Sequence, residues 1–188
     1  MKFGLGKQLQ SSRIKYNYFR FYLKKKLFGF ETANNMTRWL DKESLMYILV
    51  RNGAKIGENC DIESGLTFHN CKDYSNLIIG NNCHIGKNCF FDLKDQIIIG
   101  DNVIISMQYT FITHIDMNKS SLKNLYPAKN RKIIIENSCY IGSNSTLLND
   151  IKIGEKSIIA SKSLINQDVE HNTLYGGVPA KKIKDLFE

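Results

Sequence analysis

The chain has 188 residues, with 26 Lys and Arg against 18 Asp and Glu, which gives a formal net charge of +8. Residues 1–30 hold eight basic side chains and no acid, so the rest of the chain carries 18 bases and 18 acids. A nucleic-acid-binding domain would spread Lys and Arg over its folded face, so this distribution argues against one. The longest strongly apolar run, residues 45–50, is far shorter than the roughly 20 residues that span a bilayer. No signal-peptide order of a basic stretch before an apolar one is present, and we expect a cytoplasmic protein.

The first predicted element in chain order is an N-terminal basic and aromatic helical region, residues 1–52. Its first 30 residues interleave eight aromatic side chains with the eight bases, and the spacing of Ile14, Tyr18, Phe21 and Tyr22 suits one face of a helix. A second helix is predicted for residues 35–51, with an N-cap at Thr37 or Asp41.

Two roles are open for residues 1–30. They can help to cover the open end of a following repeat array. Alternatively, they can act as a peripheral anchor at the inner face of the membrane, because basic and aromatic helices favour anionic surfaces.

From residue 53 onward a six-residue repeat organises the chain. Each copy has an aliphatic residue, a glycine, two free positions and a small residue, and copies begin at Ile56, Ile79, Ile85, Ile99, Ile141 and Ile153. The blocks lack the 3.6-residue period of a helix and the turn signals of hairpins, so a solenoid of short strands is predicted. Gly or Asn beside the aliphatic residue is expected to supply the positive φ of each turn.

Two segments interrupt this repeat. An insertion falls at residues 70–76, and a polar stretch containing Pro127 separates Phe111 from Ile135. We interpret the second segment as a loop, residues 115–132, extruded from a coil. Long loops in compact domains commonly carry function.

This repeat resembles that of the hexapeptide-repeat acyltransferases, and the chain is similar to the maltose, galactoside and surface-polysaccharide O-acetyltransferases among them. The resemblance covers about residues 53–184. It implies an all-β solenoid, a left-handed parallel β-helix at residues 53–178 with an N-terminal helical cap and a short C-terminal helix at residues 179–188. It also implies a homotrimer with active sites between adjacent chains, and acetyl-CoA as the co-substrate.

His114 stands directly before the predicted loop, after Thr113. In the sugar O-acetyltransferases the catalytic histidine ends a coil in a similar context, so the resemblance implies that His114 is the general base. A neutral imidazole can take the proton of an acceptor hydroxyl, which is otherwise a poor nucleophile. The family places an Asn and an Asp one coil away, where this chain is about one repeat shorter. Asp92 is therefore the expected acceptor-binding residue, with Asp95 fitting nearly as well.

The segment after the loop resembles the acetyl-CoA half of the family's site. The resemblance implies that the backbones of Ser143 and Ser161 line the pantetheine crevice, and that Lys181 and Lys184 hold the CoA phosphates as point charges. Asn166 is also assigned to CoA. With Gln167 it replaces the family's Thr-Lys pair, so one phosphate contact is lost at Gln167.

The predicted function is acetyl transfer from acetyl-CoA to a hydroxyl of a sugar or surface-polysaccharide precursor. Three alternatives stay open: an N-acyltransferase on an amino sugar, a zinc-dependent hydratase of the same fold, and a non-catalytic scaffold. Hydratases of this fold bind zinc through three histidines, two of them closely spaced, and the four histidines here contain no such pair, so no metal is expected. Four of the five cysteines occupy the small position of a repeat, where filling of the core is their predicted role.

Overall fold

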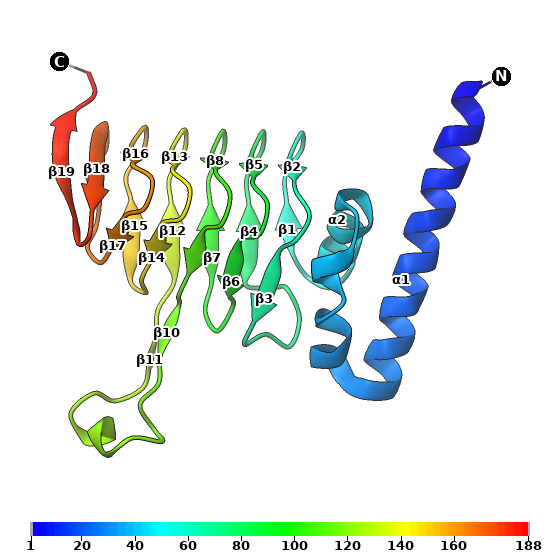
Figure 1. The fold of residues 1–188 in the computed structure, drawn as a ribbon, viewed down its shortest axis with the longest axis horizontal. Coiled ribbons are helices and arrows are strands. Elements are labelled where there is room, and N and C mark those ends of the chain that lie inside the picture. The colour runs from blue at the N-terminus through cyan, green and yellow to red at the C-terminus, as the bar shows by residue number, and fades with distance from the viewer. Residues whose placement is uncertain (1, 188) are drawn as a thin grey trace.

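The structure is a computed structural model that describes the backbone of residues 2–187 and the side chains of residues 10–187. Of the predicted basic arm, the side chains of Lys2, Phe3 and Lys7 lie outside the described residues. The chain begins with two helices and continues as a straight solenoid of stacked coils (Figure 1). The helical region comprises α1 (Lys2–Asn34), the short 3₁₀ helix η1 (Thr37–Trp39) and α2 (Lys42–Arg51).

Three parallel sheets, visited in turn, form the sides of the solenoid. Sheet A contains β1 (Lys55–Ile56), β4 (Leu77–Ile79), β7 (Ile97–Ile99), β12 (Ile133–Ile135) and β15 (Ile151–Ile153). Sheet B contains β2 (Asp61–Ile62), β5 (His84–Ile85), β8 (Ile104–Ile105), β13 (Tyr140–Ile141) and β16 (Ile158–Ile159), and then the two C-terminal strands. Sheet C contains β3 (Thr67–His69), β6 (Phe90–Asp92), β9 (Thr110–Phe111), β14 (Thr146–Leu147) and β17 (Leu164–Ile165).

The repeat aliphatics fill the interior. In sheet A, Ile79, Ile99, Ile135 and Ile153 follow one another in register, and all are buried. Sheet C contributes stacked aromatic rings, with centroids 5.5 Å apart for Phe68 and Phe91 and 4.9 Å apart for Phe91 and Phe111. Each coil thus buries its apolar side chains against the equivalent side chains of the next coil, and this burial is the main stabilising term.

The turns differ in one respect from the expectation. Positive φ is found three residues after the repeat aliphatic, at positions such as Asn59, Asn82 and Asn102. The repeat glycines instead allow the coils to approach closely, since a Cβ on Gly142 would lie 2.5 Å from the backbone nitrogen of Ser161. Of the two residue types predicted to supply the positive φ, Asn commonly does so, but three residues after the aliphatic residue rather than beside it.

A hairpin projects from the third coil (Figure 1). Its stem is formed by β10 (His114–Ile115) and β11 (Lys129–Asn130), which pair antiparallel, and a short 3₁₀ helix, η2 (Ser121–Asn124), lies near its tip. The segment predicted as an extruded loop thus lies outside the solenoid and begins at His114.

The chain ends in a strand, β19 (Ala180–Asp185), where a helix was predicted. β18 (Thr173–Gly177) continues sheet B, and β19 pairs antiparallel with it. The prediction of a C-terminal helix at residues 179–188 was therefore wrong. Gly177 turns the chain with φ +103°, which favours glycine. β19 then satisfies the backbone groups of β18, which a helix could not do.

The helical region covers the first coil. Leu45 and Ile48 of α2 are buried in one continuous core with Ile62 and Leu66. Asp41 caps α2, accepting a hydrogen bond from the backbone of Ser44 at 3.0 Å, so the helix begins at Lys42 rather than at residue 35.

Candidate active site

His114 lies at the corner of the solenoid that follows sheet C. Its Nδ1 is 2.5 Å from Oδ2 of Asp92. Asp92 belongs to the preceding coil and is only 1% exposed. The same carboxylate oxygen accepts a hydrogen bond of 2.9 Å from the backbone nitrogen of Thr113. The carboxylate therefore holds both the imidazole and the backbone that carries it.

The protonation of this pair follows from its hydrogen bonds. Burial raises the pKa of Asp92, but hydrogen bonds from His114, Asn70 and Thr113 outweigh it, and the pKa lies below its usual range. An ionised carboxylate only accepts hydrogen bonds, so Nδ1 of His114 carries the proton. In the neutral imidazole Nε2 is then the unprotonated nitrogen, which is the form that a general base requires. The imidazole is also accessible, since 29% of the side chain is exposed.

Asp92 was predicted to contact the acceptor. In the structure its two carboxylate oxygens are already hydrogen-bonded, Oδ1 to Asn70 and Oδ2 to His114. These contacts favour a role in positioning the histidine. Asp95, the second candidate, accepts a hydrogen bond from Asn130 at 2.9 Å and so holds the stem of the hairpin.

Asn70 is a residue of this corner that sequence reasoning did not assign. Its amide donates to Oδ1 of Asp92 at 2.9 Å and lies 3.4 Å from Nε2 of His114. It begins the insertion between β3 and β4 and has φ +53°. The position of an Asn at the first residue of an insertion beside sheet C is the signal that could have indicated it.

Residues predicted to bind CoA lie at a different corner, between sheets B and C. Ser143 follows β13 and Ser161 follows β16, in adjacent coils, and the backbone nitrogen of Lys162 donates to Ser143 at 2.9 Å. Ser161 is exposed and Ser143 is half-buried. The two turns are therefore stacked on one another at this corner.

The predicted phosphate-binding residues lie at the C-terminal end of the solenoid. Lys181 and Lys184 are exposed on β19 and, among the described side chains, neither forms an ion pair. Lys182 between them contacts Glu170 and Asp185, at 2.9 and 2.8 Å. Asn166 is exposed, and the neighbouring Gln167 is 3.5 Å from the carbonyl of Ala180.

One chain does not bring these two groups together. His114 lies between sheets C and A in the third coil, whereas Ser143 and Ser161 lie between sheets B and C in the fourth and fifth coils. A reaction that needs both groups therefore calls for two chains side by side.

Three of the five cysteines are poorly suited to nucleophilic catalysis. Burial raises the pKa of Cys71, Cys89 and Cys139 to about 11 in each case, which suppresses the reactive thiolate. Across the described residues, no group of three His, Cys, Asp or Glu side chains is arranged to hold a metal ion.

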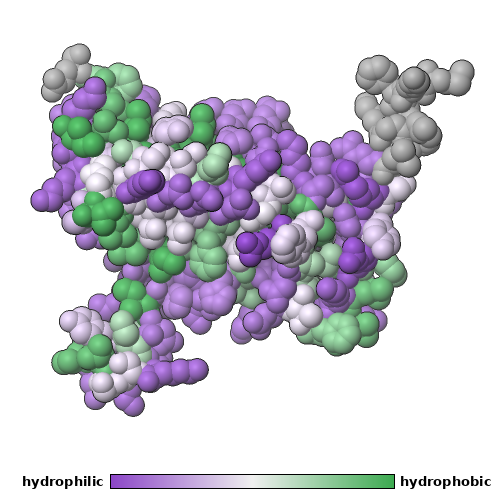
Figure 2. Space-filling view, viewed as in Figure 1, coloured by the Kyte–Doolittle hydropathy of each residue, from purple (hydrophilic) through white to green (hydrophobic). Residues whose placement is uncertain are grey.

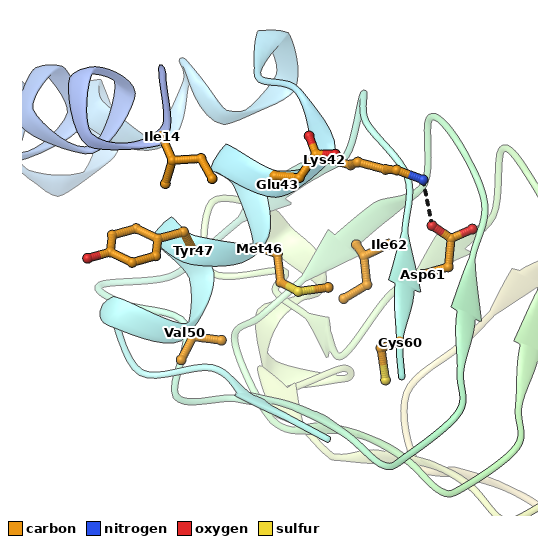
Figure 3. A pocket seen from close by; sticks show the side chains of 9 residues that line it. All are labelled: Ile14, Lys42, Glu43, Met46, Tyr47, Val50, Cys60, Asp61 and Ile62. Atoms are coloured by element: carbon orange, nitrogen blue, oxygen red, sulfur yellow. Dashed lines mark hydrogen bonds and ion pairs between the residues drawn. The ribbon is translucent and has the colours of Figure 1, made fainter. Parts of the chain in front are cut away.

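A hollow of about 460 Å³ lies elsewhere, between the helical cap and the first coil. Apolar side chains of α1, α2 and β2 line it, including Ile14, Met46 and Ile62, with the Lys42–Asp61 ion pair at its rim (Figure 3). None of the predicted site residues belongs to this hollow.

Two family models match the chain. The bacterial transferase hexapeptide (six repeats) matches residues 132–167, and the hexapeptide repeat of succinyl-transferase matches residues 76–107. Both models describe hexapeptide repeats, so these matches confirm the predicted repeat and the resemblance to the hexapeptide-repeat family.

The curated relatives are named as acetyltransferases. The chain is 28% identical over 144 residues to galactoside O-acetyltransferase of Escherichia coli (strain K12), an alignment covering 71% of this chain and 64% of that protein. It is 32% identical over 136 residues to a chloramphenicol acetyltransferase of Klebsiella aerogenes, covering 72% and 64%. The chain thus spans slightly less than two thirds of the length of these relatives.

The fold is also shared with a solved structure, a hexapeptide-repeat-containing acetyltransferase from Vibrio cholerae. That structure superposes with a TM-score of 0.72 at 24% identity, covering 93% of both chains. A second structure of the same protein is described as complexed with acetyl coenzyme A. The likeness confirms the predicted left-handed parallel β-helix with an N-terminal helical region.

Proposed function

We propose that this protein transfers an acetyl group from acetyl-CoA to a hydroxyl of a sugar or surface-polysaccharide precursor. The observation that carries the proposal is the His114–Asp92 pair, set on a hexapeptide-repeat solenoid beside a projecting hairpin. The names of the curated relatives and the acetyl-CoA complex of the Vibrio cholerae protein support the donor. The saccharide acceptor rests on the galactoside O-acetyltransferase relative.

His114 acts as the general base in a direct transfer. Nε2 takes the proton of the acceptor hydroxyl as its oxygen attacks the thioester carbonyl, so a C–O bond forms and the C–S bond breaks. The imidazolium returns the proton to the departing sulfur. Asp92 holds Nδ1 and stabilises the transient charge, and we assign it as a positioning residue.

The proposed donor, acetyl-CoA, suits the residues of β19 and of the corner between sheets B and C. Lys181 and Lys184 are exposed cations without an acidic partner in the described chain, as phosphate binding requires. The turns of Ser143 and Ser161 offer backbone groups for an extended pantetheine arm. Since one chain separates these groups from His114, we also propose a homotrimer in which each active site is formed between two chains.

The test is incubation of the purified protein with acetyl-CoA and a panel of mono-, oligo- and lipid-linked saccharides, read by release of free thiol. We expect release that depends on one class of acceptor. No release with any acceptor, together with no CoA binding at millimolar concentration, would favour the non-catalytic scaffold. Stoichiometric zinc that survives chelator washing would favour the hydratase.

A further inference from the structure

Helix α1 has apolar side chains on two opposite faces. One face packs against α2: Phe21 is buried, and the ring of Tyr18 meets that of Tyr47 edge-on with centroids 5.3 Å apart. The other face carries Tyr16, Phe19, Leu23 and Leu27, whose steps of three and four residues place them in one row. All four are between 37% and 67% exposed. Helix α1 thus has two apolar faces: α2 covers one, and the other is exposed to solvent.

Basic residues border the exposed row on both sides. At about 100° per residue, Arg20 and Lys24 lie along one edge, and Lys15 and Lys26 along the other. Arg13 is instead paired with Asp41 and Glu43, at 3.1 Å from each. Residues 10–30 contain no acid. The apolar row spans about 16 Å of helix, at 1.5 Å per residue. Hydrophobic side chains appear over the C-terminal part of α1, at the lower right of the space-filling view, among hydrophilic neighbours (Figure 2).

We propose that this exposed face of α1 binds the surface of an anionic lipid bilayer, with the helix lying in the plane of the interface. The row of Tyr16, Phe19, Leu23 and Leu27 enters the boundary between headgroups and acyl chains, and the flanking Lys and Arg contact the anionic headgroups. No helix in the described chain has the length and apolarity to cross a membrane.

Charge selects this occupant over a second copy of the same helix. Two copies packed row to row would bring Arg20, Lys24 and Lys26 of each close to those of the other, with no acid on this part of the helix to offset them. An anionic bilayer can bury the apolar row and neutralise the basic edges at the same time. Covering the solenoid and binding the membrane thus use different faces of α1 and do not compete.

The experiment is flotation of the full chain with vesicles of phosphatidylcholine alone and of phosphatidylcholine mixed with phosphatidylglycerol. We expect flotation with the anionic vesicles only, falling as salt is raised from 0.1 M to 1 M, where the screening length shrinks from about 10 Å to about 3 Å. The triple variant Phe19→Gln, Leu23→Gln, Leu27→Gln should lose at least about tenfold in the bound fraction. Glutamine keeps the helix propensity, so unfolding temperatures should match the wild type.

Two further variants complete the design. Arg20→Gln, Lys24→Gln, Lys26→Gln should remove the preference for anionic vesicles. The control Leu125→Gln, Tyr126→Gln removes equally exposed apolar side chains from the hairpin and should float like the wild type. A wild-type chain that stays at the bottom with anionic vesicles overturns the proposal, as does a row variant that floats unchanged. A row variant that changes only the oligomeric state would assign the face to a second copy instead. None of these readouts depends on acetyl transfer.

Discussion

A carboxylate that accepts a hydrogen bond from Nδ1–H of a histidine leaves Nε2 as the unprotonated nitrogen of the neutral ring, and at this corner Asp92 accepts that bond from His114. The pair is held by the fold, because the same carboxylate also binds the backbone of Thr113. The depressed pKa of Asp92 ties this arrangement to the stability of the protein.

The stability effect has a defined pH window. A group with a lowered folded-state pKa contributes stability above its unfolded pKa, about 3.9 for Asp, and loses that contribution as the pH falls through the folded-state pKa. Asp92→Asn lacks this contribution. The wild type should therefore exceed the variant in free energy of unfolding above about pH 4, by a margin that shrinks on further acidification. Urea titrations of both proteins between pH 2 and 7 measure it, and a margin that grows with acid would contradict the assignment.

A second prediction at the residue scale concerns CoA. Gln167 stands where the resembling enzymes carry a lysine, and its side chain only approaches the carbonyl of Ala180. Gln167→Lys should restore a phosphate contact and tighten CoA binding up to about tenfold, which corresponds to about 1.4 kcal/mol. Calorimetric titration with CoA measures this change. Gln10→Lys adds the same charge on α1, at the opposite end of the solenoid, and should leave the affinity unchanged. Equal effects of the two variants would indicate general electrostatics rather than a local contact.

At the scale of elements, the two faces of α1 differ in what they stabilise. Phe21 is buried against the helical cap, whereas Phe19 is 57% exposed on the opposite face. Phe21→Ala should lower the free energy of unfolding by about 3–5 kcal/mol, since it leaves a cavity. Phe19→Ala should stay within about 0.5 kcal/mol. Denaturant unfolding of this matched pair tests the packing, and similar losses for both variants would contradict it.

The elements were predictable to the extent that their signals were local. The hexapeptide period at Ile79, Ile85 and Ile99 identified the coils, because each copy needs the same inward side chain. The C-terminal strand β19 was missed because Lys181 and its neighbours are equally compatible with an exposed helical face. Its pairing partner, β18, lies where the six-residue period fails.

The site was only partly predictable for a similar reason. Thr113 and His114 before a polar stretch indicated the base, but its contact with Asp92 depends on how the coils register after the insertion at residues 70–76. The role of Asn70 depends on the path of that same insertion. Such contacts between coils depend on the folded geometry and cannot be predicted from the spacing of residues along the chain.

At the scale of the whole molecule, the separation of the two corners is the main feature. His114 and the turns of Ser143 and Ser161 belong to different corners, so an active site made by two chains predicts complementation. His114→Ala and Ser161→Trp, each inactive alone, should regain activity when co-expressed, because some sites then receive an intact half from each chain. Thiol release by the purified mixed assemblies measures it. A monomeric wild type with full activity would contradict a shared site.

The excess positive charge of the molecule lies in α1 rather than in the solenoid. The proposed membrane binding and the proposed acetyl transfer therefore use different parts of the chain. A membrane-bound helical cap would hold the solenoid where lipid-linked saccharides are available as acceptors. This arrangement rests on both the proposed transfer and the proposed surface, and the two can fail independently.

We propose His114 as the base for transfer from acetyl-CoA. The most direct test is thiol release from acetyl-CoA with an accepted saccharide, comparing the wild type with His114→Ala at matched CoA affinity. We expect His114→Ala to lose about 10²–10⁴ in kcat with the CoA dissociation constant unchanged. A His114→Ala variant that keeps near-full turnover with every acceptor would contradict it.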